Sequence, residues 1–224
     1  MHAIIDLGAG TTDVSICNLF VPSGGSISYW YAARNIPTGT IKVGRIIASY
    51  LNEQANKRPC SCVEVSNFLD NLGGYRSSTT RTQEGHWKLM SSIKDEIEVI
   101  RDSEDYRKTW GSAYKRHLKK ESAWEKVEVF VSGGGANLPF IEEVFSIPWW
   151  SQLKIKYPVS SLPAPDDFSA EDSGAPFQRM AVAYGLARPL PELEEYVLPA
   201  DVPDHTPPPL PRRDLPDRDD LYPK

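Results

Sequence analysis

The amino-acid sequence predicts an α/β domain with a mixed sheet and flanking helices, on three observations. Short apolar runs of strand length precede two glycine-rich loops, at residues 8–10 and 133–135. Between the loops, apolar residues recur every three or four positions over long stretches, as they do in helices. The chain has 224 residues, 40% of them hydrophobic, which is enough to bury a core as one domain or two small ones.

The first part of the chain is predicted to form three strands followed by a helix. Residues 3–7 and 13–19 are expected to be strands on either side of the first glycine turn, and residues 26–36 a third strand with aromatic content. Thr38 can cap a helix over about residues 40–55. The two strands around the turn would form a hairpin.

A helical insertion is predicted next. Helical spacing of apolar residues covers 63–72 and 87–100, and a charged helix is expected over 104–121. The domain, residues 1–188, would then consist of two core segments and one inserted, mostly helical subdomain. These pieces are 1–57 and 126–188 for the core, and 58–125 for the insertion.

The remaining core elements begin with the strand that precedes the second glycine loop. They are a strand at 127–131, a helix from Pro139 to about residue 145, a short strand at 154–157 and a last helix at 177–187. Beyond them, residues 189–224 contain ten of the nineteen prolines. Such a composition buries too little apolar surface to fold alone, so we expect a proline-rich, disordered acidic tail.

Charge and composition exclude several classes of function. The net charge is −5, and the tail alone carries nine acidic and four basic residues, so the body is neutral and unsuited to nucleic acid. Neither a membrane-spanning run nor a signal peptide is evident. Cys17, Cys60 and Cys62 are too few for a zinc site and odd in number, which favours a cytoplasmic protein.

The first glycine loop does not match the best-known nucleotide motifs. Gly10 is followed by Thr11 and Thr12, without the lysine of a phosphate loop, and Asp13 stands where a dinucleotide fingerprint requires glycine. A hairpin tip of this kind can still bind phosphate through converging backbone N–H groups. Asp6 fits beside phosphate only through a divalent cation or a water. The alternative is a tight hairpin whose glycines serve only the turn.

Three motifs together resemble the actin, heat-shock-chaperone and sugar-kinase ATPase superfamily. DLGAGTTDVSI, residues 6–16, resembles its second phosphate motif, closest to the chaperone and bacterial actin-like branches. VFVSGGGANLPFIEEVF, residues 129–145, resembles its adenosine motif, and SGAPFQRMAVAYGLA, residues 173–187, its second connecting helix. The resemblance covers residues 1–188 and implies the ribonuclease-H-like second lobe of such an ATPase.

The resemblance implies a site for ATP or ADP with Mg. Asp6 would be the catalytic acid that positions metal-bound water near the terminal phosphate, and it would hold the metal through that water. The other residues implied in nucleotide binding are Gly8, Ala9, Gly10, Thr11, Thr12, Gly39, Gly133, Gly134, Gly135 and Asn137. Asn137 departs from the chaperones, which have a stacking arginine there.

The superfamily's first lobe, with its own phosphate motif, has no counterpart in this sequence. We expect that lobe to be a separate partner chain, to be lost from a truncated gene, or to lie upstream of a misassigned start. Phosphoryl transfer needs charge stabilisation from both sides of the nucleotide, so hydrolysis is expected only when a first lobe is supplied.

The tail offers a rival function. Pro208, Pro211 and Arg213 form a P-x-x-P-x-Arg pattern that suits a polyproline-binding domain. The alternative is a solvated spacer, which is commoner where no partner domain is known. The sequence thus predicts a nucleotide-binding lobe of a chaperone-like or actin-like ATPase. The alternative is a non-catalytic scaffold that recruits partners through the tail.

Overall fold

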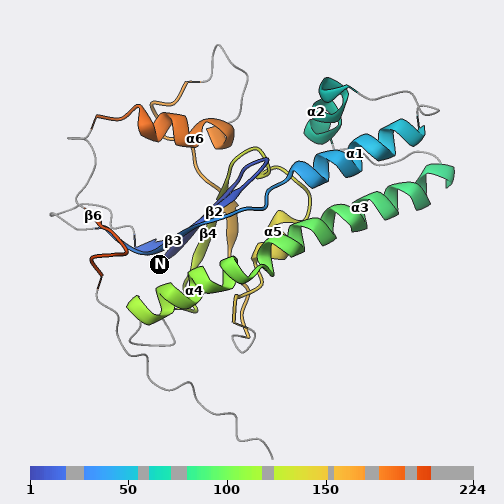
Figure 1. Cartoon of the computed structure of the whole chain (residues 1–224). Coiled ribbons are helices and arrows are strands. Elements are labelled where there is room, and N and C mark those ends of the chain that lie inside the picture. The colour runs from blue at the N-terminus through green and yellow to red at the C-terminus, as the bar shows by residue number, and fades with distance from the viewer. Residues whose placement is uncertain are drawn as a thin grey trace, which may run out of the picture.

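A computed structural model describes the chain at residues 1–18, 28–54, 61–71, 80–117, 124–150, 154–169, 177–189 and 196–202. Its centre is a six-stranded mixed sheet in the order β5-β4-β1-β2-β3-β6 (Figure 1). The strands are β1 His2–Leu7, β2 Thr12–Asn18, β3 Ser28–Ile36, β4 Glu128–Ser132, β5 Val159–Ser161 and β6 Tyr196–Val197. The mixed α/β sheet predicted from the sequence is confirmed.

The first two strands form the predicted hairpin, because apolar and polar residues alternate along both. In β1, Ala3, Ile5 and Leu7 are buried, and the residues between them face the other side of the sheet. β1 pairs antiparallel with β2, which opposes Asp6 to Asp13, and parallel with β4, which sets Asp6 beside Ser132. Both glycine loops therefore emerge at the same edge of the sheet.

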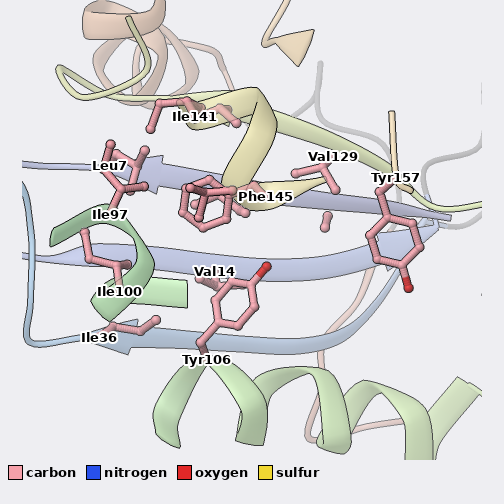
Figure 2. Close-up of a cluster of buried hydrophobic side chains, with 14 of the residues drawn as sticks. Leu7, Val14, Ile36, Ile97, Ile100, Tyr106, Val129, Ile141, Phe145 and Tyr157 are labelled. Atoms are coloured by element: carbon pink, nitrogen blue, oxygen red, sulfur yellow. The ribbon is translucent and has the colours of Figure 1, made fainter. Parts of the chain in front are cut away.

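The described helices surround this sheet on both sides. They are α1 Ile41–Gln54, α2 Cys62–Asn71, α3 Thr80–Arg101, α4 Glu104–His117, α5 Ile141–Phe145 and α6 Phe177–Leu186. Figure 2 shows Ile97 and Ile100 of α3, Tyr106 of α4 and Phe145 of α5 packed against the strands. α6 lies on the opposite side of the sheet from α4 (Figure 1).

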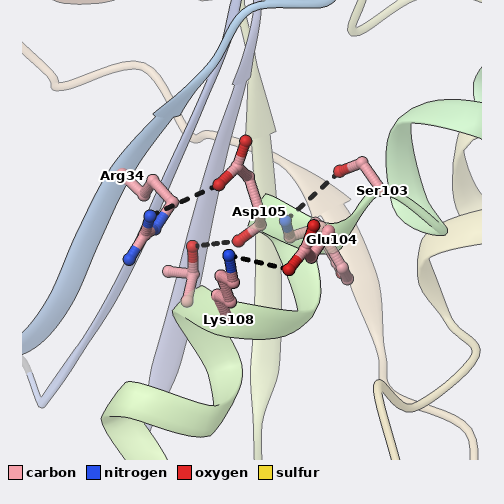
Figure 3. Close-up of polar contacts among 7 residues, drawn as sticks. Arg34, Ser103, Glu104, Asp105 and Lys108 are labelled. Atoms are coloured by element: carbon pink, nitrogen blue, oxygen red, sulfur yellow. Dashed lines mark hydrogen bonds and ion pairs between the residues drawn. The ribbon is translucent and has the colours of Figure 1, made fainter.

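Polar contacts fix α4 against β3. Ser103 caps the helix, since its Oγ accepts a hydrogen bond of 3.2 Å from the Tyr106 amide. Arg34 of β3 forms an ion pair of 3.3 Å with Asp105, and Glu104 pairs with Lys108 one turn on at 2.7 Å (Figure 3). The predicted insertion, 58–125, is helical where described, and its helices α3 and α4 share one hydrophobic core with the sheet.

The structure corrects three local predictions. The strand predicted at 154–157 is irregular, and β5 lies at Val159–Ser161, where the backbone reaches β4. Pro139 does not open a helix, because Phe140 takes a left-handed conformation (φ 69°) and α5 begins at Ile141. The long helix α3 begins at Thr80, earlier than residue 87, where the predicted helical spacing begins.

Part of the predicted disordered tail is ordered. Tyr196 and Val197 form β6, which pairs parallel with the start of β3, and Val202 is buried in the core. The open edge of β3 offers backbone donors and acceptors that a two-residue strand can use. Pro208, Pro211 and Arg213 lie outside the described residues, as does Cys60. In the part of the chain that the structure describes, no helix is long and apolar enough to cross a membrane.

Candidate functional site

A pocket of about 380 Å³ opens where the hairpin turn, the start of α1 and the second glycine loop meet. The first two contribute Ala9 and Thr40, and the glycine loop contributes Gly134. Helices α1 and α2 form the rest of the wall with Leu138. The remaining lining residues are Ile41, Val43, Gly44, Arg45, Ala48, Cys62 and Val65.

Hydrogen bonds tie the hairpin turn to the start of α1. The amide of Thr40 donates to the Gly8 carbonyl at 3.0 Å, and the amide of Ile41 donates to the Ala9 carbonyl at 2.8 Å. The Thr40 hydroxyl also donates to the Gly8 carbonyl, at 3.2 Å. The Ile41 amide at the start of α1 is thus already used, and these contacts position the hairpin turn against the helix.

Three of the predicted site glycines are required by packing. A Cβ on Gly39 would lie 2.6 Å from the carbonyl oxygens of both Gly8 and Ala9, and one on Gly135 would lie 2.6 Å from Cγ2 of Thr40. Gly133 has a φ of +83°, and a Cβ there would lie 2.2 Å from Oδ1 of Asp6. These glycines let three segments approach each other closely.

Two other glycines face open space. A Cβ on Gly10 or on Gly134 would meet nothing within 4 Å. Among the described residues, the amides of Ala9, Gly10, Thr11 and Gly134 donate no turn, loop or capping hydrogen bond. Free backbone donors around open space are what an oxyanion such as phosphate requires.

Asp6 lies at the end of β1, directly opposite Asp13 of β2. Burial raises the pKa of the Asp6 carboxyl above its ordinary value, and the nearby Asp13 carboxylate raises it further. Asp13 accepts a hydrogen bond of 2.9 Å from Asn35, which holds its side chain. Two carboxylates on neighbouring strands repel each other unless a cation lies between them. No cluster of three metal-ligating side chains occurs among the described residues.

The predicted site residues do not all face the pocket. The Thr12 side chain is buried, and its hydroxyl donates to the Thr38 carbonyl at 2.8 Å, so it braces the turn from within. Asn137 lines a separate pocket of about 350 Å³, together with Glu142 and β5.

The sequence did not predict most of the residues of α1 and α2 that line the pocket. Gly44 and Arg45 of α1, and Cys62 and Val65 of α2, line the pocket without belonging to any motif. The glycine at position 44 was the one hint in the sequence. A glycine within a helix costs about 1 kcal/mol of stability relative to alanine, so its presence suggests that a side chain at this position would obstruct a function. A Cβ there would meet nothing within 4 Å.

No protein-family model matches this chain. A search of curated proteins likewise finds no match. Among solved structures, MreB5 of Spiroplasma citri bound to ADP is 17% identical, with a TM-score of 0.39, over 83% of this chain and 51% of that one. An archaeal actin homolog is 14% identical, with a TM-score of 0.36, over 64% of this chain and 39% of the other.

The ethanolamine utilization protein EutJ from Carboxydothermus hydrogenoformans is 18% identical, with a TM-score of 0.37. That match covers 70% of this chain and 43% of EutJ. The chain spans about half or less of the length of each of these proteins.

Proposed function

We propose that this chain is the nucleotide-binding lobe of an actin-like or chaperone-like ATPase and binds the phosphates and ribose of ATP with Mg. The observation that carries the proposal is the pocket at which the hairpin turn, α1 and the glycine loop converge. Its volume of about 380 Å³ lies within the range of small-molecule sites. ADP, which keeps two of the phosphates, fits the same site.

The phosphates would lie at the open glycines. Gly10 and Gly134 leave room for them, and the free amides around the two glycines would donate to their oxygens. Gly39, Gly133 and Gly135 act indirectly by allowing the turn, α1 and the loop to come together. Thr12 likewise acts through Thr38, since its hydroxyl is already used.

Asp6, with Asp13 beside it, would hold the metal through water. A divalent cation there would relieve the repulsion between the two carboxylates and, when bound, would neutralise phosphate charge. The raised pKa of Asp6 also suits a group that accepts a proton from a positioned water. The residues present therefore fit Mg bound jointly with phosphate rather than a metal held by protein ligands alone.

Hydrolysis would require a second lobe. The described groups that face the phosphate end all come from one side: the hairpin turn, α1 and the glycine loop. Phosphoryl transfer is stabilised by charge on both sides of the transferring group. We therefore propose that a first lobe, from the same protein or from a partner chain, closes over the nucleotide.

Calorimetric titration of Mg-ATP into the purified chain tests this function. We expect saturable heat from the natural sequence and at least a tenfold loss of affinity in Gly10→Val, whose side chain fills the phosphate space. Gly111→Val is the matched control, because Gly111 also faces open space but lies in α4. Absence of heat up to millimolar Mg-ATP in the natural sequence would contradict the proposal.

A scaffold function is the second candidate. The segment after α6 returns to the sheet as β6, which anchors the chain next to the proline-rich residues 203–224. A polyproline-binding domain that recognises Pro208, Pro211 and Arg213 would then be recruited next to β3. Deleting residues 203–224 should abolish capture of such a domain and leave nucleotide binding unchanged; retained capture would exclude this function.

A further inference from the structure

The pocket has two ends, and α1 runs from one end to the other. Ala9, Thr40 and Gly134 mark the phosphate end, whereas Ala48 and Val65 lie farther along the helices. Thr40 and Ala48 are eight residues apart, which at 1.5 Å per residue is roughly 12 Å along α1. If the phosphates bind as proposed above, the far end receives the nucleotide's base, so the inference drawn here rests on that function.

Most of the far end cannot distinguish one base from another. Ala48, Val65 and Leu138 present apolar surface, which packs equally well against the flat face of any purine. The Thr40 hydroxyl is occupied by the Gly8 carbonyl. Of the lining residues that the structure describes, Arg45 is the one that carries a charge. Cys62 adds only a thiol, which is a weak donor and a weak acceptor, so base selection at this end falls to Arg45.

The guanidinium of Arg45 is available to bind a ligand. Lys42, one turn earlier on α1, forms an ion pair of 3.6 Å with Glu96 of α3. Within the described ranges, Arg45 forms neither a hydrogen bond nor an ion pair, and its side chain is exposed. The neighbouring Gly44 leaves open space beside it. The guanidinium can therefore turn into the pocket without breaking a contact.

We propose that Arg45 selects the base of the bound nucleotide and favours guanine over adenine. A guanidinium offers donors and no acceptor. Guanine presents two acceptors, O6 and N7, on one edge, whereas adenine presents N7 beside an amino donor that would face the guanidinium's own donors. GTP accordingly binds this pocket more tightly than ATP, which still binds through its phosphates and ribose.

The test compares affinities for ATP and GTP, measured by displacement of a fluorescent nucleotide. We expect GTP to bind the natural sequence roughly 5- to 100-fold more tightly than ATP, the range set by one well-placed arginine pair. Arg45→Gln, which offers a donor and an acceptor and so suits adenine, should lower that preference at least fivefold. Arg45→Met should reduce it towards unity, and Lys42→Met should leave it unchanged.

Inorganic tripolyphosphate separates the base from the phosphates. Its affinity should be the same in the natural sequence, Arg45→Gln and Arg45→Met, and melting curves verify that each variant is folded. The inference is overturned if the natural sequence prefers ATP, or if its preference for GTP survives both Arg45 substitutions. It is also overturned if tripolyphosphate binding falls with Arg45. A chain that binds neither nucleotide contradicts the proposed function itself.

Discussion

At the scale of single residues, the predicted site glycines have two different roles that the sequence does not distinguish. Gly39 and Gly133 are places where a side chain would collide with a backbone carbonyl or with Asp6. Gly10 and Gly134 face open space and border free amides. Substitutions at the first pair should therefore damage the fold, and those at the second pair should damage binding alone.

Asp6 provides a test with a defined dependence on pH. Its pKa is raised, so ionisation of the carboxyl opposes folding at neutral pH, and this penalty is absent below the ordinary pKa of 3.8. Asp6→Asn should therefore raise the melting temperature at pH 7. The gain should shrink as the pH falls through the raised pKa and vanish below 3.8.

Thermal melts of both proteins across pH 3 to 8, each in matched buffers, measure this difference. The same Asp6→Asn chain should bind Mg-ATP more weakly, because it lacks the carboxylate that we propose holds the metal's water. A melting temperature that falls at pH 7 would contradict the electrostatic account. Higher stability together with weaker binding is the result expected if the Asp6 carboxylate serves ligand binding at a cost in stability.

At the scale of elements, α1 runs from the hairpin turn along the wall of the pocket. The amides of Thr40 and Ile41, at its start, donate to the hairpin turn, and residues farther along it line the pocket. Gly44 interrupts this wall within the first turns of the helix. Glycine lowers the stability of a helix. A ligand site that needs the space beside Gly44 would explain why this cost is present.

Gly44→Leu should separate stability from binding. Leucine is a better helix former and its Cβ would meet no atom within 4 Å, so the free energy of unfolding should stay equal or rise by up to about 1 kcal/mol. The same side chain would fill the pocket, and affinity for ATP should fall at least tenfold. Urea unfolding and calorimetry measure the two quantities.

Gly111→Leu is the control, because Gly111 also lies in a helix with open space around it. It should show a similar change in stability and unchanged affinity. Equal ATP binding by Gly44→Leu and the natural sequence would place the ligand elsewhere. A loss of stability in Gly44→Leu would show that the space next to Gly44 is filled by the protein itself.

At the scale of the whole molecule, one hydrophobic core joins segments far apart in the sequence. Residues of β1 to β4, α3 and α4 belong to one buried cluster, and Val202 joins it after the chain has passed α6. The aromatic side chains Tyr106, Trp110 and Trp124 are fully buried within it. The segment 196–202 is therefore part of the fold and not of a free tail.

Two truncations test this conclusion. Deleting residues 203–224 should leave the free energy of unfolding unchanged. Deleting 196–224 should lower it by about 1–3 kcal/mol, since the buried Val202 side chain is lost and the edge of β3 is opened. Urea denaturation measures both proteins. Equal stability of the two truncated chains would contradict a structural role for β6.

Sequence periodicity predicted the elements whose faces are strongly patterned. Alternation in β1 and β2, the apolar run of β4 and helical spacing in α1 and α3 each correspond to an observed element. Two elements escaped prediction for a physical reason. β5 and β6 have three and two residues and too little pattern of their own, so they exist only because β4 and β3 present open edges.

The sequence by itself determined the hairpin, the two glycine loops and the mixed α/β class, because these depend on local backbone freedom and on burial patterns within each element. Only the tertiary structure decided which groups face the pocket. Thr12 turns inward to Thr38, Asn137 lines another cavity, and Arg45 and Gly44 enter the wall. The face that a side chain presents to a neighbouring element depends on long-range packing, which no local pattern records.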